Sequence, residues 1–123
     1  MRILILSFYY PPDIGPGALR AKSIVDALIK EGPSDLKIDV LTTMPNRYHS
    51  LNIPALRHEV NDKISINRFN LPKHKNRILD QSKAFFSFSL FVQKFIFKKK
   101  FDIVVATSGR LMTASLATLV AKQ

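Results

Sequence analysis

Hydrophobic residues near the start of the chain form an unbroken run, which changes to a helical spacing after a short loop. Residues 3–6 are continuously apolar, a pattern typical of a strand that is covered on both faces of a parallel sheet. Pro11 and Pro12 lack the backbone donors that a sheet needs, so the strand must end before them. Beyond the loop, apolar positions recur at roughly 3.6-residue spacing: Leu19, Ile24, Val25, Leu28 and Ile29. We therefore predict a strand, a loop and an amphipathic helix that starts near Gly17 and ends at Gly32.

The pattern of apolar and polar residues predicts further elements along the chain. It predicts strands at 37–42 and 64–69, and in the strand at 64–69 the residues Ile64, Ile66 and Phe69 alternate with polar residues. Residues 46–61 read as a long loop with one helical turn at 53–58. Residues 78–97 and 111–122 read as helices that flank a strand at 101–106. The order β-α-β-β-α-β-α predicts an α/β fold with a Rossmann-like, doubly wound, mostly parallel sheet, in one domain that spans residues 1–123.

The loop between the first strand and the first helix is the candidate ligand site. A helix that begins at the carboxyl end of a parallel strand presents unpaired N–H groups and a partial positive charge, which favours an anion. Gly15 and Gly17 match the first two glycines of the dinucleotide motif GxGxxG, but Arg20 occupies the third position, so the motif fails. Both glycines are expected to adopt backbone angles that other residues avoid.

An arginine at this position can reach a phosphate, a carboxylate or a sugar hydroxyl. The expected ligand-binding residues come from this loop and from the loop after the strand at 101–106: Gly15, Pro16, Gly17, Arg20, Ser108 and Gly109. Tyr9 and Tyr10 are candidates for stacking on a sugar or a base, or for packing beneath the loop. The alternative is a loop that only turns the chain, with Arg20 in a surface ion pair.

The charge of the chain indicates an anionic partner. Nineteen Lys and Arg residues against nine Asp and Glu residues give a net charge of +10, and residues 73–100 contain eight basic residues and one acidic residue. The helix at 78–97 also carries six phenylalanines. Its apolar length of about 14 residues is too short to span a bilayer. We expect it to dock on an anionic membrane surface through Phe85, Phe88, Phe91, Phe95, Lys98, Lys99 and Lys100. Burial between the sheet and another domain is the alternative.

Other chemistries find little support in the sequence. The chain has no cysteine, and its three histidines are spaced irregularly, so we predict no metal site and no cofactor. The nine acidic residues are scattered singly, so no pair suggests two-carboxylate catalysis. A basic nucleic-acid-binding protein remains an alternative class, although aromatic residues concentrated on one helix do not resemble a base-stacking surface. The start of the chain runs directly into a strand pattern, which disfavours a secretory signal and favours a cytoplasmic location.

Three stretches resemble the N-terminal domain of retaining glycosyltransferases with the two-domain GT-B architecture, particularly the family-4 enzymes of bacterial lipopolysaccharide, capsule and exopolysaccharide assembly. They are ILILSFYYPPDIGPGALRAKSIVDAL, IDVLTTMPNRY, and the HKNR connector with the Phe-rich helix and FDIVVATSGRLMTASLATLVAK. Pro16 between the glycines, and EGPSDLK after the first helix, depart from the pattern of the family.

The resemblance implies an acceptor-binding domain of an enzyme that moves a sugar from a nucleotide-diphosphate sugar to a glycan acceptor, which is often lipid-linked, at the inner face of the cytoplasmic membrane. In that family a separate C-terminal domain binds the donor and carries an E-x7-E carboxylate pair. These 123 residues contain neither, so no activity is expected from them alone. Because the aromatic residues cluster on one helix, no nucleic acid is expected as a partner. A stand-alone nucleotide- or anion-binding module of the flavodoxin-like kind is the alternative.

Overall fold

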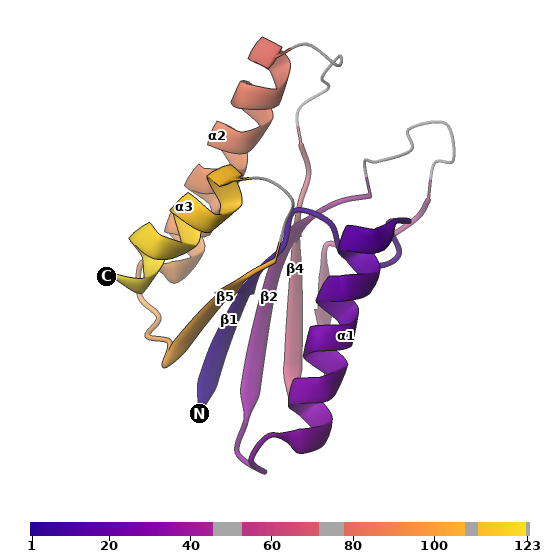
Figure 1. Cartoon of the computed structure of the whole chain (residues 1–123), viewed down its shortest axis with the longest axis vertical. Coiled ribbons are helices and arrows are strands. Elements are labelled where there is room, and N and C mark those ends of the chain that lie inside the picture. The colour runs from indigo at the N-terminus through magenta and orange to yellow at the C-terminus, as the bar shows by residue number, and fades with distance from the viewer. Residues whose placement is uncertain (46–52, 72–77, 108–110, 123) are drawn as a thin grey trace.

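The computed structural model describes residues 1–45, 53–71, 78–107 and 111–122, which form five strands and three helices (Figure 1). In chain order these elements are β1 (Arg2–Leu6), α1 (Pro16–Glu31), β2 (Lys37–Thr43), β3 (His58–Val60), β4 (Ile64–Phe69), α2 (Ile78–Ile96), β5 (Ile103–Ala106) and α3 (Leu111–Ala121). The expected α/β class with a mostly parallel sheet is confirmed, and the arrangement is compatible with a Rossmann-like fold.

The five strands lie in one sheet in the order β3-β4-β2-β1-β5. β1 pairs in parallel with β2 on one side and with β5 on the other, and β2 pairs in parallel with β4. The side chains of Ile3, Leu4, Ile5 and Leu6 are almost wholly buried because β1 has a neighbouring strand on each side and helices over each face. This accounts for the unbroken apolar run in the sequence.

The short strand β3 departs from the predicted element order. His58–Val60 pairs antiparallel with β4, with Glu59 opposite Ile66, so the helical turn expected at 53–58 is wrong. The amide of Asn61 donates to the carbonyl of Ile64 (2.8 Å), which closes a tight hairpin between the two strands. Backbone pairing with β4 supplies hydrogen bonds that a single helical turn in this segment would not.

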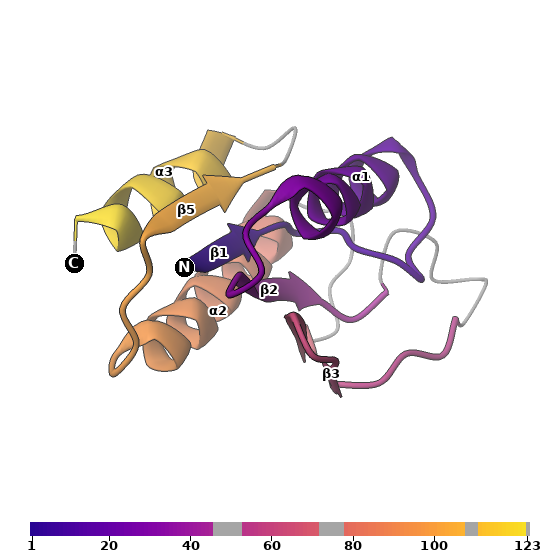
Figure 2. The same ribbon diagram turned by 90° about the horizontal axis from the view of Figure 1, so that it is seen from below.

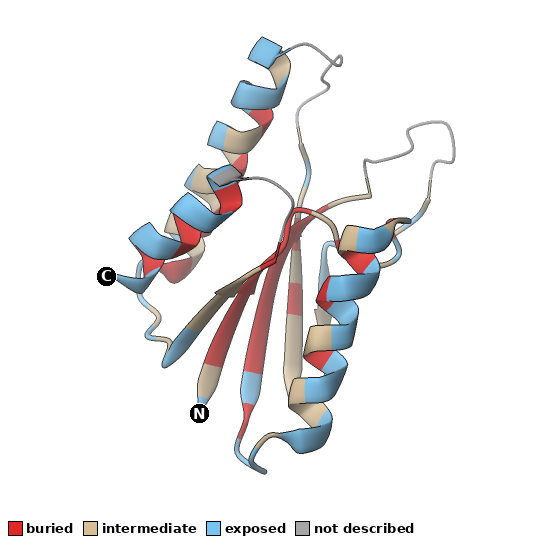
Figure 3. Cartoon of the chain, in the orientation of Figure 1, coloured by how far each residue is buried: buried red, intermediate tan, exposed pale blue. Residues whose placement is uncertain are grey.

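Two helical layers cover the sheet, as the view from below shows most clearly (Figure 2). On one face, α1 packs its residues Ala21 and Val25 against Ile3 and Ile5 of β1. On the other face, α2 and α3 pack together against the alternate side chains of β1, Leu4 and Leu6. The buried positions therefore concentrate in the sheet and on the inward sides of the helices (Figure 3).

The first helix begins one residue earlier than predicted and uses smaller residues for its buried side. Pro16 occupies its first turn, and its end is marked by the amide of Gly32 donating to the carbonyl of Leu28 (2.9 Å). Its buried residues are Ala18, Ala21 and Val25, while the predicted position Leu19 is 64% exposed. The inward side of α1 is therefore the line through Ala18, Ala21 and Val25, and Leu19 lies outside it.

Candidate functional site

The loop that follows β1 lies at the carboxyl edge of the sheet, between the ends of its two neighbouring strands. The amide of Ser7 donates to the carbonyl of Leu41 at the end of β2 (3.1 Å), and the amide of Thr107, just after β5, donates to the carbonyl of Leu6 (3.0 Å). From β1 the chain continues to α1 on one face, and from β5 it continues to α3 on the other. Ligands of open α/β sheets bind at such a point, where the connections diverge. We call this place the β1–β5 crevice.

Hydrogen bonds hold the first half of this loop in shape. The hydroxyl of Ser7 donates to the carbonyl of Tyr9 (2.6 Å), and the hydroxyl of Thr43 donates to the carbonyl of Phe8 (2.7 Å). The amide of Asp13 donates to the carbonyl of Tyr10 (3.0 Å), across the cis peptide bond between Pro11 and Pro12. The loop is therefore shaped before any ligand arrives.

The two glycines of the loop differ in their backbone conformation. Gly15 has φ 141° and is the residue before the first turn of α1, where its carbonyl accepts the amide of Leu19 (3.1 Å). Among the described residues it is the single glycine at positive φ, so the unusual angle expected for Gly17 is not found. A side chain at Gly17 would meet the ring of Tyr9 at 3.7 Å, an ordinary contact distance. Gly17 therefore leaves space beside the first turn of α1.

The first turn of α1 contains no acidic residue, and Gly15, the residue before it, provides no side-chain cap. The N–H groups of this turn and their partial positive charge favour an anion. Arg20 is exposed one turn further on and makes no ion pair with any part of the chain that the structure describes. The surface ion pair considered from the sequence is thus not seen. Ser108 and Gly109 lie outside the described residues.

The two tyrosines of the loop differ in burial. Tyr9 is half-buried with its ring edge-on to Phe8 (5.3 Å between centroids), whereas Tyr10 is only 5% exposed and packs beneath the loop. Burial, together with the charge of Asp26, raises the pKa of Tyr10 to about 12. Tyr10 is therefore a neutral group with a structural role. Of these two tyrosines, Tyr9 is the one exposed enough to stack on a ligand.

Arg68 is a buried cation beneath the loop. In the strand predicted at 64–69, it is one of the polar residues that alternate with the apolar ones. Its guanidinium donates to the carbonyls of Leu56 (2.7 Å) and Pro11 (2.8 Å) and to the carboxylate of Glu59 (2.8 Å). Its position could have been found from the sequence, because Ile64, Ile66 and Arg68 share one face at a period of two.

A groove of about 490 Å³ opens beside this arginine. It is lined by Pro11, Pro12, Pro54, Ala55, Leu56, Glu59 and Arg68. The Nε atom of Arg68 is buried and has no hydrogen-bond partner among the described residues. Through its hydrogen bonds to Pro11 and Leu56, the guanidinium links the loop after β1 to the segment that precedes β3.

The phenylalanines assigned to membrane docking lie on the inward side of α2. Phe88 is wholly buried, so its assignment to a docking surface is wrong, and Phe85, Phe91 and Phe95 are half-buried against the same core cluster. The ring of Phe91 stacks on Phe69 at the end of β4 (5.1 Å between centroids). Residues Ala84, Phe88, Val92 and Ile96 recur every four positions, which is the stripe that one helix presents to a sheet.

Exposed apolar residues lie along α2 and just after it. Phe86 is 64% and Leu90 48% exposed, and Phe97, which follows the last residue of α2, is 82% exposed. Phe86 and Leu90, with residues of α3, border an apolar groove of about 340 Å³ that is lined by Phe85, Phe86, Ser89, Leu90, Gln93, Met112, Ser115, Leu116 and Leu119. We call Phe86, Leu90, Phe97, Met112 and Leu119 the outer apolar surface. Lys98 and Lys100 beside it are exposed, and the ammonium of Lys99 lies 3.5 Å from the centroid of the Phe95 ring.

No helix within the described ranges has the length and apolar character needed to cross a membrane. In the same part of the chain, no three His, Asp or Glu side chains gather where they could hold a metal ion. The chain matches no family of proteins, no curated protein and no solved structure.

Proposed function

We propose that this chain is the acceptor-binding, N-terminal domain of a glycosyltransferase with the GT-B architecture, which transfers a sugar from a nucleotide-diphosphate sugar to a lipid-linked glycan acceptor in cell-surface polysaccharide synthesis. The observation that carries the proposal is the β1–β5 crevice, because two of the stretches that resemble that enzyme family lead into it. The YYPPDIGPG loop follows β1 there, and Thr107 follows β5.

The chemistry of the crevice suits an acceptor with anionic and hydroxyl groups. The uncapped first turn of α1 offers N–H donors and a partial positive charge, Gly17 leaves room beside them, and Arg20 can form charge-assisted hydrogen bonds with a phosphate or a hydroxyl. The proposed role of these groups is to bind and orient the acceptor.

The carboxylates of the domain support a binding role rather than a reacting one. Among the described residues, Asp13 and Asp39 are the buried acids. Asp13 accepts the amide of Ile14 (3.0 Å), and Asp39 is held by the guanidinium of Arg2 at 2.8 Å. Groups engaged in this way are poor candidates for a general base. Donor binding and sugar transfer are therefore assigned to other parts of the enzyme.

The test is a titration of this chain, labelled with ¹⁵N, with short-prenyl diphosphate-linked monosaccharides, uridine diphosphate and single-stranded RNA. We expect the prenyl-linked sugars to shift the amide signals of residues 7–20 and of Thr107, and uridine diphosphate to bind more weakly. Tighter binding of uridine diphosphate would support a stand-alone nucleotide-binding module, and tighter binding of RNA a nucleic-acid-binding protein. Either result would overturn the proposal.

Two variants of α1 sharpen this test. Arg20→Ala should weaken acceptor binding by about 5- to 150-fold, since a charge-assisted hydrogen bond to a ligand contributes about 1–3 kcal/mol. Lys30→Ala is the matched control, because Lys30 is an exposed cation at the opposite end of the same helix. Equal affinity of the two variants for the acceptor would show that Arg20 does not contact it.

The proposed location at an anionic membrane rests on the outer apolar surface and the neighbouring lysines. An exposed apolar patch flanked by cations is typical of a protein that lies on an anionic bilayer, where each Lys or Arg close to the surface contributes roughly 1 kcal/mol. Such a location would place the crevice near a lipid-linked acceptor.

A further inference from the structure

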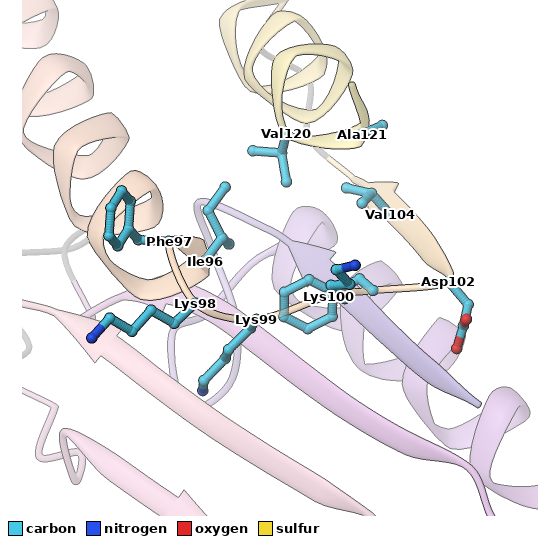
Figure 4. Close-up of a pocket in the computed structure, with 10 residues that line it drawn as sticks. Ile96, Phe97, Lys98, Lys99, Lys100, Asp102, Val104, Val120 and Ala121 are labelled. Carbon is cyan, nitrogen blue, oxygen red and sulfur yellow. The ribbon is translucent and has the colours of Figure 1, made fainter. Parts of the chain in front are cut away.

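A second cleft lies at the opposite edge of the sheet from the β1–β5 crevice. It has a volume of about 710 Å³ and is formed where α2 ends, β5 begins and α3 ends (Figure 4). Its lining residues are Ile96, Phe97, Lys98, Lys99, Lys100, Phe101, Asp102, Val104, Val120 and Ala121. Small-molecule sites typically have volumes of 300–1,000 Å³. We call it the basic cleft.

The inner walls of the basic cleft are apolar and come from three elements. Ile96 of α2, Val104 of β5 and Val120 of α3 face the same space (Figure 4). Ile96 and Val120 also belong to the hydrophobic core cluster, so these walls are continuous with the interior of the protein. An alkyl chain that binds between these walls would transfer its apolar surface from water to apolar contacts, which is favourable.

The mouth of the cleft is cationic. Lys98, Lys99 and Lys100 follow one another, and none of them forms an ion pair with a residue that the structure describes. The side chains of Lys98 and Lys99 extend away from the apolar walls, and the carboxylate of Asp102 also points away from them (Figure 4). That carboxylate accepts the amide of Arg2 (2.7 Å). The acid nearest to the cleft is thus directed toward β1.

The position of the lysines after α2 has a simpler explanation, which covers only part of the observations. Cations at the end of a helix complement the negative end of its dipole, and this accounts for positive charge near Ile96. It does not account for an apolar cleft of this size beside them. Charge and apolar walls together point to a ligand that has both an anionic and an apolar part.

We propose that the basic cleft binds a single-chain anionic amphiphile, with its alkyl chain against Ile96, Val104 and Val120 and its carboxylate or phosphate at Lys100. The occupant follows from charge complementarity, because Lys100 supplies a cation at the cleft and the walls present hydrocarbon. The same chemistry is found in a free fatty acid and in a membrane phospholipid. This site is separate from the β1–β5 crevice and does not depend on the proposed glycosyltransferase function.

The test is calorimetric titration of the chain with monomeric decanoate and with decanol, which has the same alkyl chain and no charge. We expect decanoate to bind with one-to-one stoichiometry and at least tenfold more tightly than decanol. Lys100→Gln should weaken decanoate binding about tenfold and leave decanol binding unchanged, because it removes a charge-assisted contact and no apolar surface. Equal affinity for the two ligands would overturn the proposal.

Two further measurements define the site and the source of the ligand. Lys83→Gln, at an exposed lysine of α2 that does not line the cleft, should leave decanoate binding unchanged, and a loss equal to that of Lys100→Gln would overturn the proposal. Vesicles with anionic phospholipid form the second arm. Weaker vesicle binding by Lys100→Gln than by Lys83→Gln, which removes the same charge, would identify a membrane lipid as the occupant, and equal vesicle binding by the two variants a free fatty acid. Binding to vesicles without any binding of decanoate would overturn the cleft as the site.

Discussion

Gly15 and Gly17 are two residues apart, yet the loop depends on them for different physical reasons. Gly15 is required by its backbone, whose φ of 141° lies in a region that side chains rarely allow. Gly17 instead matters for the space that it leaves beside α1. Replacing each by alanine separates a requirement of folding from a requirement of binding.

We predict that Gly15→Ala lowers the free energy of unfolding by about 1–3 kcal/mol, the usual cost of forcing a side chain into such a conformation. Urea denaturation followed by circular dichroism would measure the loss. The matched control is Gly17→Ala, whose added methyl group meets only the Tyr9 ring at 3.7 Å and should leave stability nearly unchanged. Similar losses for both variants would contradict the assignment.

Tyr10 is predicted to ionise well above the ordinary pKa of a tyrosine. Because burial raises its pKa to about 12 from 10.0, the folded chain holds this proton over a range in which the unfolded chain releases it. Stability should therefore be unaffected by Tyr10 below pH 10 and should fall as the pH rises from 10 toward 12. Absorbance titration near 295 nm would show a late step that Tyr10→Phe removes. A late step that persists in this variant would assign the shift elsewhere.

At the scale of elements, Arg68 joins β4 to two other segments. One guanidinium holds the carbonyls of Pro11 and Leu56 and the carboxylate of Glu59, so the loop after β1 and the segment before β3 share one buried partner. Leu56 and Glu59, which lie between β2 and β4 in the sequence, are thereby linked to the loop after β1 at the candidate site.

Arg68→Leu should lower the free energy of unfolding by about 3 kcal/mol, since it leaves buried carbonyls without donors and Glu59 without its cation. Chemical denaturation would measure this loss. Arg57→Leu is the control, because Arg57 is an exposed arginine in the same connection and its replacement should change stability by at most about 0.5 kcal/mol. Comparable effects of the two changes would show that the buried contacts of Arg68 contribute little.

At the scale of the whole molecule, the net charge of +10 and the outer apolar surface act together. We predict that the chain co-sediments with vesicles that contain anionic lipid and that this binding weakens between low and physiological ionic strength, because salt screens exposed charges. Replacing Phe86 and Leu90 by serine should reduce binding at both ionic strengths, since it removes apolar surface and leaves the charge unchanged.

Leu19→Ser is the control for apolar exposure, because Leu19 is 64% exposed on α1, at the opposite face of the sheet. It should bind vesicles as the unaltered chain does. Equal binding to neutral and anionic vesicles would reject the electrostatic part of the model. A loss with Leu19→Ser as large as with the double variant would place the contact elsewhere.

The sequence by itself determined the elements whose patterns are dictated by burial on both sides. The run at residues 3–6 predicted the central strand because a strand with neighbours and helices around it has no polar position. Pro11, Pro12 and Gly32 marked the ends of elements through local backbone chemistry that needs no knowledge of the fold. The α/β class followed from the alternation of such strands with long helical patterns.

Only the tertiary structure decided which residues of α2 face the core and how the chain between β2 and β4 is held. A helix with phenylalanine on several sides has no unique inward face in its sequence, and the sheet selected the line through Phe88 and left Phe86 outside. β3 forms because β4 offers an unpaired edge, a partner that residues 58–60 do not reveal by themselves. Arg68 is buried because three acceptors from distant segments surround its guanidinium, and such a long-range arrangement exists only once the chain has folded.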